Sequence, residues 1–476
     1  MRKHILGVLF ISLLLNISAY SQNQALEEFI SNPALRRANI SLLVKNVTTS
    51  NTVLEYRSKT CAIPASTTKI VTTATALETL TPDFKFETIL QYDGDISNGV
   101  LNGNIYILGG LDPTLGSKYM GTQNFLTQWM LAIKDMGIEE INGNIIADAS
   151  LIDNQGVNQK WLWEDLANYY GAGTYALSVY DNLCTVRFKT GAPGTIAEVV
   201  STSPKQPGLH IKSYVKAAKT GSDDSYFFGA PLSGERTIYG TLPANKSAFY
   251  VKSDIYNPPM FIAQKLYEKL EDNGISVSGK PDVLWTKEKG ARMRVGINVI
   301  ESPVLSEIVS DINHRSNNHY AEHVYRYLGS RHKFGSDASE GADVIKSYWK
   351  SRGLDTEGLL QFDGCGLATT NAITADFMVS LLIYEKTKGK YFDEFYESLP
   401  IAGENGTVKK LLKGTKLEGK VHAKSGSISR TQCYAGYIEW DGETYAFAVM
   451  VNNFSGVRSN VQKAIENLLL SVTEAD

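Results

Sequence analysis

A chain of 476 residues has room for about three domains. Hydrophobic residues make up 43% of it and charged residues 20%, which is typical of a globular protein and excludes a disordered one. The 47 Lys and Arg residues against 50 Asp and Glu residues give a net charge of −3, so the sequence offers no basic surface for nucleic acid. The four cysteines, Cys61, Cys184, Cys365 and Cys433, form no C-x-x-C pair. This argues against a zinc ribbon and leaves their disulfide pairing open.

The first residues have the pattern of a secretory signal peptide. The basic pair Arg2-Lys3 precedes an apolar stretch from Ile5 to Ile17, and Ala19-Tyr20-Ser21 places small residues where a signal peptidase reads them. We therefore predict a signal peptide over residues 1–21 and export to the periplasm or another extracytoplasmic compartment. The alternative is an uncleaved membrane anchor, but a spanning helix needs about 20 apolar residues. No second long apolar run follows, so we expect no integral membrane segment after cleavage.

In chain order, the first predicted element is a loop that enters a helix between Ala62 and Leu80, where apolar residues recur at helical spacing. From Phe86 to about Ser203 the pattern changes to short β-like runs separated by turn residues. Strand-like alternation continues from Leu209 to Val215. A helix follows Asn257-Pro258-Pro259 and ends at Gly274.

The last third of the chain is predicted to be mainly helical, with two strands near its end. The expected helices are Leu305 to Ile312, His319 to Leu328, Gly341 to Trp349, Thr374 to Lys386 and Asn460 to Leu470. The expected strands are Gln432 to Trp440 and Glu443 to Val451. We predict an α/β (α+β) fold in which residues 22–85 and 290–476 form one domain. A largely β insertion over residues 86–289, forming two small domains, interrupts it.

The sequence Ser66-x-x-Lys69 lies at the start of the first predicted helix and is a candidate catalytic pair. Residues three positions apart share a helix face, so the Lys amine can reach the Ser hydroxyl. An amine that is partly desolvated, or lies beside another cation, has a lowered pKa and can act as the base for that hydroxyl. Ser213-x-x-Lys216 has the same spacing, but in a strand its two side chains point to opposite faces. The first pair is therefore the better candidate.

Two further motifs belong to the same serine acyl-transfer chemistry. One is Ser-x-Asn, which Ser316-Asn317-Asn318 supplies, and the other is Lys-[Ser/Thr]-Gly on a strand. Lys189-Thr190-Gly191, Lys219-Thr220-Gly221 and Lys424-Ser425-Gly426 all fit the second motif. The order of motifs in this class places it last, which selects Lys424. The glycine at its third position lets the substrate backbone approach the strand closely.

Segments beyond these three motifs match one family. They are Gly109 to Leu115, Ala176 to Asn182, Tyr320-Ala321-Glu322, Asp363 to Leu367, Leu399 to Gly403 with Gly406-Thr407, and Ala423 to Ser427. On these residues the chain resembles the D-alanyl-D-alanine carboxypeptidase/endopeptidases of the low-molecular-mass, class C penicillin-binding proteins, over essentially its whole mature length. The long separation between Lys69 and Ser316 also fits, because this family carries extra domains there and single-domain β-lactamases do not.

The resemblance implies a β-lactamase/transpeptidase-like domain, in which an antiparallel sheet is flanked by helices. It also implies hydrolysis of a D-Ala-D-X peptide of peptidoglycan through an acyl-enzyme on Ser66, with Lys69 taking the proton. Ser316 is expected to relay a proton to the leaving amine. Asn318 and Lys424 are expected to hold the polar network of the site. Peptidoglycan peptides are then the substrates and β-lactams are covalent inhibitors, with no metal or organic cofactor.

By the same resemblance, the strand that carries Lys424 binds the substrate. Ser425 is expected to bind the terminal carboxylate, beside Gly426. The backbone N–H groups of Ser66 and Ser427 are expected to form the oxyanion hole, a contribution of about 3–4 kcal/mol per donor at other acyl-transfer sites.

The segment Ile145 to Ser150 is similar to the family segment that leans over the cleft, and Asp148 stands at its acidic position. Peptidoglycan stems commonly carry a diamino acid, whose free amine needs an anionic partner. Asp148 is therefore a candidate substrate-binding residue through a charge-assisted hydrogen bond. The alternative is that Asp148 only caps a turn after a strand.

Two positions depart from the family pattern. Ser425 replaces the usual Thr, which keeps the hydroxyl and removes a methyl group. Cys365 stands where the family usually has Ser. A catalytic role for Cys365 is the less favoured interpretation, because no His is placed near it in sequence and buried free cysteines usually only pack.

Two other functions stay open from the sequence. His319-x-x-Glu322-His323 is the inverted zinc-protease signature and would indicate a secreted metallopeptidase, whose third ligand would come from elsewhere. We prefer an ordinary helix with two surface histidines, because Tyr-Ala-Glu at this distance after Ser-x-Asn belongs to the penicillin-binding pattern. The second alternative is a non-catalytic cell-wall binding protein, which is poorly motivated because every polar group of the site is present.

Overall fold

The structure, a computed structural model, describes residues 22–287, 290, 292–331 and 333–474. The predicted signal peptide over residues 1–21 lies outside the described residues. None of the helices within these described ranges is long and apolar enough to cross a membrane. The chain forms two units, and each is described by itself below. Among the described residues, the first comprises 22–82, 306–317 and 342–474, and the second comprises those within 83–305 and 318–341.

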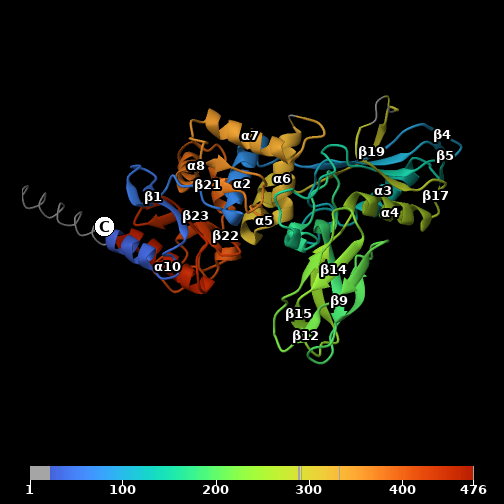
Figure 1. Cartoon of the computed structure of the whole chain (residues 1–476). Helices are drawn as coiled ribbons and strands as arrows, with labels where there is room; N and C mark the ends of the chain where they lie inside the picture. Colours follow the sequence, from blue (N-terminus) through green and yellow to red (C-terminus); the bar gives the residue numbers. More distant parts are fainter. Residues whose placement is uncertain (1–21, 288–289, 291, 332, 475–476) are drawn as a thin grey trace, which may run out of the picture. The chain divides into compact units, whose positions relative to one another are not determined.

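The first unit is built on an antiparallel sheet that joins segments from both ends of the chain (Figure 1). Its strand order is β2-β1-β24-β23-β22. The bounds are β1 (Asn39–Asn46), β2 (Thr52–Tyr56), β22 (Val421–Ile428), β23 (Thr431–Trp440) and β24 (Glu443–Asn452). β1 pairs with β24 in a register that runs from Asn39↔Asn452 to Asn46↔Tyr445. β22 is an edge strand, so one side of its backbone can receive an extended peptide.

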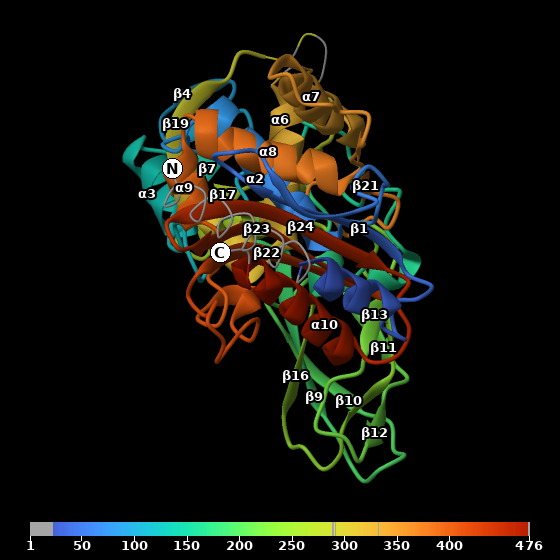
Figure 2. The same cartoon turned by 90° about the vertical axis from the view of Figure 1, so that its left-hand side faces the viewer.

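Helices cover both faces of this sheet (Figure 2). Side chains alternate between the faces of a strand, and Ile40, Leu42 and Val44 of β1 belong to a core that also contains residues of α10 (Arg458–Leu470). α8 (Ala375–Lys388) contacts β1 and β24 on the other face. The flanked antiparallel sheet confirms the predicted fold class.

The remaining elements of this unit carry the loops described below. They are α2 (Thr68–Leu80), most of α5 (Leu305–Arg315) and of α7 (Ala338–Ser351), α9 (Phe392–Glu397), and the short strands β20 (Leu359–Leu360) and β21 (Ala372–Ile373). Each helix and strand predicted in the last third of the chain forms, with its ends within a few residues of the expected bounds.

One buried acid in α8 predicts a pH-dependent stability. Glu385 is 1% exposed, and burial, followed by the nearby charge of Glu78, raises its pKa to about 8. The pKa of Glu385 is higher in the folded chain than in the unfolded chain, so keeping its charged form buried lowers the free energy of unfolding. This loss of stability is absent below about pH 4.5 and grows as the pH rises toward 8. We expect Glu385→Gln to raise the free energy of unfolding by about 3 kcal/mol at pH 7 and to leave it nearly unchanged at pH 4.

Urea unfolding at both pH values measures this effect, with exposed Glu357→Gln as the matched control, for which we expect a change within about 0.5 kcal/mol. An equal gain at pH 4 and pH 7 would show that the charge of Glu385 has no part in it.

The second unit contains a mixed five-stranded sheet with the order β18-β8-β6-β3-β19. Its bounds are β3 (Glu87–Tyr92), β6 (Ile105–Gly109), β8 (Ile145–Asp148), β18 (Pro281–Leu284) and β19 (Val295–Glu301). β6, β8 and β18 are parallel neighbours, which need crossover connections, and α3 (Phe125–Asp135) and α4 (Pro258–Glu271) lie within these connections. A smaller sheet has the order β17-β7-β5-β4, with β4 (Asp95–Ser97), β5 (Val100–Asn102), β7 (Glu140–Ile141) and β17 (Ser276–Val277).

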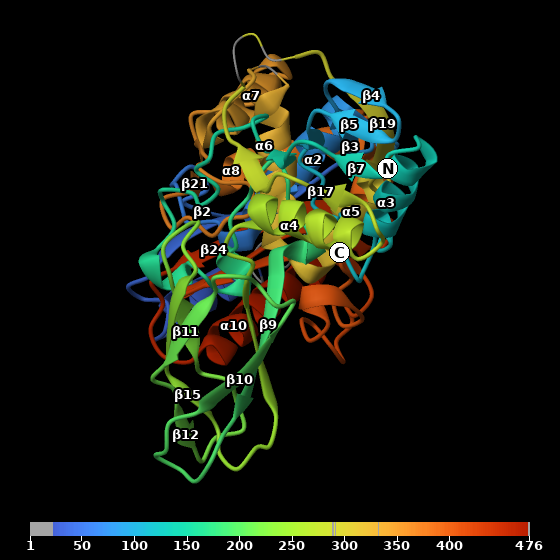
Figure 3. The same cartoon turned by 90° about the vertical axis from the view of Figure 1, so that its right-hand side faces the viewer.

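Three further sheets lie between β8 and α4 in sequence (green in Figure 3). Their orders are β10-β9-β16, β11-β14-β13 and β12-β15. The bounds are β9 (Leu183–Lys189), β10 (Glu198–Ser203), β11 (His210–Ser213), β12 (Lys216–Ala218), β13 (Tyr226–Phe228), β14 (Glu235–Tyr239), β15 (Thr241–Pro243) and β16 (Phe249–Asp254). The division of the insertion into two small domains stays a prediction.

Two features of the second unit differ from expectation. α3 forms where short strands were expected: Phe125, Trp129 and Ile133 are buried at four-residue spacing, a helical period that aromatic and β-branched residues obscure. The unit also includes residues 290–305 and 318–341, which we expected in the domain formed by the two ends of the chain. β19 belongs to it because it pairs with β3 along its length.

Candidate active site

Ser66 lies on a 3₁₀ turn, η1 (Ala65–Thr67), that leads directly into α2. Ala65 has a φ of 47°, a left-handed conformation that is rare for a residue with a side chain. The hydroxyl groups of Thr67 and Thr68 donate to the carbonyl oxygens of Pro64 and Ala65 at 2.7 and 2.8 Å. These contacts hold the strained turn and leave Ser66 partly exposed at its end.

Lys69 lies one turn further along and contacts Ser66 as predicted. Its Nζ is 3.1 Å from Ser66 Oγ and 2.6 Å from the carbonyl oxygen of Cys365. The side chain is 0% exposed, so its amine is removed from bulk water. Ser66 and Lys69 therefore form a hydroxyl–amine pair with the geometry required for proton transfer.

The loop that carries the Cys365 carbonyl is held by a buried carboxylate. Asp363 is 0% exposed and accepts hydrogen bonds from Gly366 N, Ala368 N and Asn371 Nδ2 at 2.6 to 2.8 Å. Gly366 has a φ of +83°, and a Cβ there would lie 1.9 Å from Ala65 O. Only glycine fits, and the loop is consequently packed directly against the turn that carries Ser66.

The second predicted serine and lysine also meet. Ser316 follows α5 with a φ of 55°, and Lys424 on β22 donates from Nζ to Ser316 Oγ at 3.0 Å and to Ser425 O at 2.8 Å. Lys424 is 0% exposed. Burial, and then the charge of Lys69, holds its pKa well below its usual range. Two amines thus share one buried site, which disfavours their both being charged.

The rest of the Lys424 motif lines the same edge strand. Ser425 Oγ lies 2.7 Å from Thr407 Oγ1, and Ser427 is exposed with its Oγ 2.8 Å from Gln432 Oε1. A Cβ on Gly426 would lie 2.5 Å from Pro64 O and 3.0 Å from Ser66 N. β22 and the nucleophile turn are therefore in backbone contact, which only a glycine permits.

Two predicted site residues belong to the second unit. Asn318 begins α6 (Asn318–Ser330), and its Nδ2 donates to Tyr170 O at 2.9 Å. Asp148 ends β8 and is 3% exposed. Its Oδ1 accepts from the backbone N and the hydroxyl of Ser150, and its Oδ2 lies 2.5 Å from Arg294 Nη1. The carboxylate is thus paired within its own unit, an arrangement that favours the turn-cap alternative; its role toward substrate stays a prediction.

For Asp148→Asn we expect a loss of about 2–5 kcal/mol in the free energy of unfolding, because the substitution leaves a largely buried Arg294 without its partner. If the carboxylate is structural, kcat/KM falls equally for a stem peptide with a free side-chain amine and for the same peptide acetylated at that amine. A loss confined to the amine-bearing peptide, about tenfold to a hundredfold, would instead place Asp148 in the substrate site. Urea unfolding and the two kinetic assays measure both effects.

The expectation of two surface histidines on α6 is wrong. His319 is 5% exposed and His323 is 0% exposed, because nearly every residue of the helix is packed inside the unit. His323 Nδ1 lies 2.8 Å from His319 O, which can only accept, so this nitrogen carries the proton and Nε2 accepts from Ser178 Oγ at 3.0 Å. Both nitrogens of His323 are therefore used by protein groups. Burial lowers its pKa to about 4, so the ring is neutral at ordinary pH.

The other copies of the Ser-x-x-Lys and Lys-Thr-Gly motifs do not form the buried serine–lysine contacts of the candidate site. Ser213 ends β11, Lys216 begins β12, and Ser213 Oγ donates to Ala197 O at 2.9 Å. Lys189 and Lys219 are exposed, in contrast to buried Lys424. Cys365 is buried with its Sγ 3.7 Å from Asp363 Oδ2, as expected of a packing residue.

Sequence reasoning missed several groups that complete the site. The carbonyl of Cys365 and the carboxylate of Asp363 position Lys69, and Thr407 contacts Ser425. Arg458 donates to Ile428 O at 2.7 Å and to Gln432 Oε1 at 3.0 Å, which supports the end of β22. The segments around Asp363 and Thr407 had matched the family pattern, but no pattern in the sequence indicates which atom of each segment is used.

A serine on a strained helix-entry turn, a buried lysine at its hydroxyl and a second serine–lysine pair on an antiparallel edge strand define a serine acyl-transfer enzyme of the β-lactamase/transpeptidase-like class. Comparison with known proteins agrees. The sequence matches the D-Ala-D-Ala carboxypeptidase 3 (S13) family over residues 22–473, so the chain belongs to that family and is a serine-type peptidase of the predicted kind.

Similar proteins and solved structures match most of the length of this chain. A D-alanyl-D-alanine carboxypeptidase of Actinomadura sp. (strain R39) is 26% identical over 90% of this chain and 81% of its own. D-alanyl-D-alanine carboxypeptidase DacB of Haemophilus influenzae is 25% identical over 88% of this chain and 86% of its own. The crystal structure of penicillin binding protein 4 from H. influenzae has the same fold, with a TM-score of 0.79, 24% identity and coverage of 91% and 96% of the two chains.

Proposed function

We propose that this chain hydrolyses D-Ala-D-X bonds in the stem peptides of peptidoglycan, as carboxypeptidase and endopeptidase, through an acyl-enzyme on Ser66. The observation that carries the proposal is the contact of Ser66 Oγ with the buried amine of Lys69, beside the contact of Ser316 Oγ with Lys424. The amine of Lys69 supplies the base that the hydroxyl needs.

In the first step, Ser66 Oγ attacks the carbonyl carbon of the scissile bond and Lys69 Nζ takes the hydroxyl proton. The backbone N–H groups of Ser66 and Ser427 stabilise the developing oxyanion. Ser316, held by Lys424, relays to the leaving amine the proton that Lys69 has taken up, and the C–N bond breaks to leave an ester on Ser66. Water then attacks this ester, which releases the shortened peptide and restores the hydroxyl.

The substrate is oriented by the edge strand. An extended peptide adds to β22, and Ser425 with Thr407 receives the terminal carboxylate through hydroxyl donors. Because Gly426 has no Cβ, the backbone of β22 lies directly against the backbone of the turn that carries Ser66.

A β-lactam presents its strained amide to the same nucleophile and leaves a covalent acyl group on Ser66. This part of the proposal draws on a relative of the same fold, the H. influenzae penicillin binding protein 4, which has been crystallised in complex with a β-lactam. We further propose that the chain works outside the cytoplasmic membrane after removal of residues 1–21, where peptidoglycan is accessible.

Labelling with a fluorescent penicillin, with and without EDTA, tests the proposal against both alternatives. We expect one label per chain and release of D-alanine from a D-Ala-D-Ala peptide, both unaffected by EDTA. Stoichiometric zinc in the purified protein, with activity that follows the zinc content, would overturn the serine mechanism. A folded protein that neither takes the label nor releases D-alanine would be the non-catalytic binding protein.

A further inference from the structure

The sheet β11-β14-β13 has an unusual outward face. Its buried side carries Arg236, Ile238 and Phe227, and strand alternation sends the other side chains outward. These outward residues are His210, Lys212, Tyr226, Phe228, Glu235, Thr237 and Tyr239. All residues of the three strands are described, and every outward one is either a ring or a hydrogen-bonding group; none is aliphatic.

The rings on this face are continuous with two further rings, Tyr214 from the loop after β11 and Trp163 from the 3₁₀ turn η2 (Trp163–Asp165). Tyr214 stacks on Tyr239 at 5.1 Å and 10°, and Trp163 stacks on Phe228 at 6.4 Å and 22°. Phe228 also lies 5.5 Å from Tyr226 and 5.9 Å from Tyr239. We call these five rings the aromatic platform. Trp163 is 57% exposed and Tyr226 and Tyr239 are each 44% exposed, so large apolar ring surfaces face water.

Buried polar contacts hold the platform from beneath. Asn168 is 4% exposed; its Oδ1 accepts from Phe227 N at 2.9 Å, and its Nδ2 donates to Phe227 O at 3.1 Å and to Glu164 O at 3.0 Å. One side chain thus ties β13 to the turn that carries Trp163. The two stacked rings Trp163 and Phe228 are consequently fixed relative to each other.

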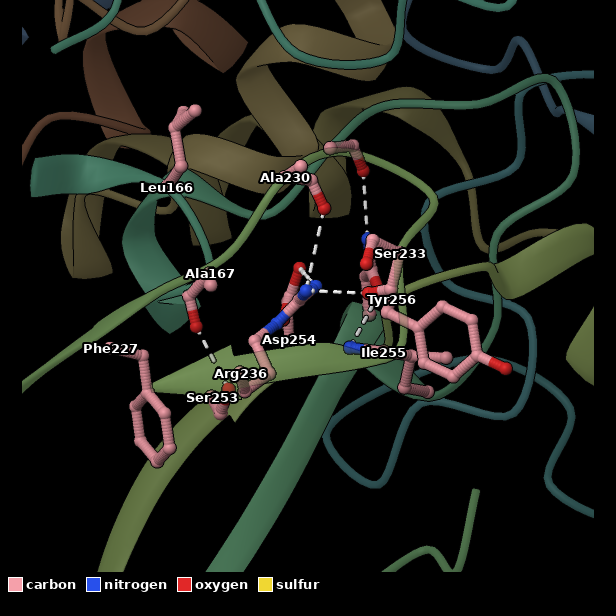
Figure 4. Close-up of polar contacts among 12 residues, drawn as sticks. Leu166, Ala167, Phe227, Ala230, Ser233, Arg236, Ser253, Asp254, Ile255 and Tyr256 are labelled. Atoms are coloured by element: carbon pink, nitrogen blue, oxygen red, sulfur yellow. Dashed lines mark hydrogen bonds and ion pairs between the residues drawn. The ribbon is translucent and has the colours of Figure 1, made fainter. Parts of the chain in front are cut away.

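A buried ion pair fixes the central strand in the same way (Figure 4). The Arg236 guanidinium contacts both carboxylate oxygens of Asp254, with Nη2 to Oδ2 at 3.0 Å, and its Nη1 donates to Ser233 O at 2.6 Å. Ser253 Oγ donates to Ala167 O at 2.8 Å. These contacts connect β14 and β16 to the loops around the platform, so the exposed rings are preorganised, which reduces the entropy lost when a ligand binds.

We propose that the aromatic platform binds the glycan strand of peptidoglycan. A pyranose ring presents an apolar face of C–H groups and a rim of hydroxyls, which matches rings bordered by Lys212, Thr237 and Glu235. The inference rests on the proposed function, because the stem peptides that the enzyme cleaves are covalently attached to such strands. The platform would retain the polymer while successive peptides reach Ser66.

The chemistry of the face favours a glycan over other ligands. A stable protein interface has an apolar core in which aliphatic residues and Met accompany the aromatics, and the three strands present none. A nucleic acid or an anionic membrane would need a cluster of cations, whereas the outward face carries one Lys and one Glu. A polymer with ring faces and hydroxyls is the class that this face fits best.

The test measures binding of the mature chain, carrying Ser66→Ala to prevent turnover, to purified peptide-free glycan strands. We expect Trp163→Ala together with Tyr239→Ala to weaken this binding by about tenfold or more, since two stacking surfaces are removed. Tyr250→Ala is the matched control, because Tyr250 is 61% exposed on β16 and lies outside the platform. Trp163→Phe keeps a ring and is expected to retain most of the affinity.

Unchanged glycan binding in the double variant overturns the inference, as does an equal loss in Tyr250→Ala. A double variant that instead loses self-association in sedimentation, with glycan binding intact, would identify a protein-docking face and also overturn it. If the double variant melts at a clearly lower temperature, Trp163→Ala alone decides, since Trp163 makes the most exposed contribution.

The outcome is separable from that of the proposed function. In the Ser66-containing chain, the platform variants should hydrolyse a small soluble D-Ala-D-Ala peptide at the parent rate and lose rate only on intact peptidoglycan. Failure of the parent chain to hydrolyse the small peptide counts against the proposed function, whatever the glycan assay shows.

Discussion

Ser66→Ala is expected to lower D-alanine release by about 10⁴-fold or more and to abolish covalent penicillin labelling. The substitution removes only the Oγ that Lys69 Nζ contacts at 3.1 Å, and no other group in the proposed mechanism can form the acyl ester. Because Ser66 is partly exposed and its Oγ bonds, among the described residues, to Lys69 of the same helix entry, we expect the melting temperature to stay close to that of the parent.

Ser213→Ala provides the matched control for this experiment. It makes the same chemical change in the other Ser-x-x-Lys sequence, where Ser213 Oγ donates to Ala197 O and Lys216 lies on a separate strand. We expect full activity and full labelling. Labelling that survives in Ser66→Ala and is lost in Ser213→Ala would show that the nucleophile has been assigned to the wrong motif.

Gly426→Ala is expected to lower kcat/KM for a D-Ala-D-Ala peptide by about a hundredfold, although it leaves every catalytic side chain in place. The added Cβ would lie 2.5 Å from Pro64 O and 3.0 Å from the backbone nitrogens of Ser66 and Thr67. These are backbone atoms, so either β22 or the nucleophile turn must shift. A shift of this kind misplaces Ser66 Oγ relative to the oxyanion donors, and penicillin acylation slows with it.

Gly296→Ala is the matched control, because Gly296 also lies within a strand, β19, and a Cβ there would meet no atom of the described residues within 4 Å. We expect nearly unchanged kinetics for it. Rates of penicillin labelling under single-turnover conditions and kcat/KM for the peptide measure the comparison. Parental kinetics in a folded Gly426→Ala enzyme would show that β22 and the turn do not need their close backbone contact.

In the candidate site, contacts between residues close in sequence could be predicted from their spacing, whereas contacts between distant segments could not. Ser66 and Lys69 were predictable because a helix start brings residues three positions apart together whatever the rest of the fold does. The partnership of Lys424 with Ser316 was expected only through the family resemblance, since 3.0 Å between residues so far apart in sequence depends on how α5 and β22 pack. The Cys365 carbonyl at Lys69 was missed, because backbone acceptors leave no residue-type signature.

The burial of individual side chains could likewise not be predicted from local spacing. The spacing of His319 and His323 predicted a helix, and α6 is one, but we placed both histidines at its surface and they are buried. A single helix does not determine which of its faces are covered, because burial depends on the elements that pack around it. The same holds for Asp148. Its position at the end of a strand could be predicted from the sequence, whereas its ion pair with Arg294 joins segments that are distant in sequence.

By itself, the sequence determined the helix entry that carries Ser66 and Lys69, because local spacing and side-chain chemistry decide it, whereas the β-lactamase/transpeptidase-like fold and the choice of Lys424 came from the family resemblance. Only the tertiary structure decided which loop holds Lys69, which amine is buried beside it, and that Gly426 touches the backbone of the nucleophile turn. It also decided that five aromatic rings from separate segments form one exposed surface. The physical reason is that contacts between distant segments form only when the chain buries its core, and composition and periodicity carry no record of that geometry.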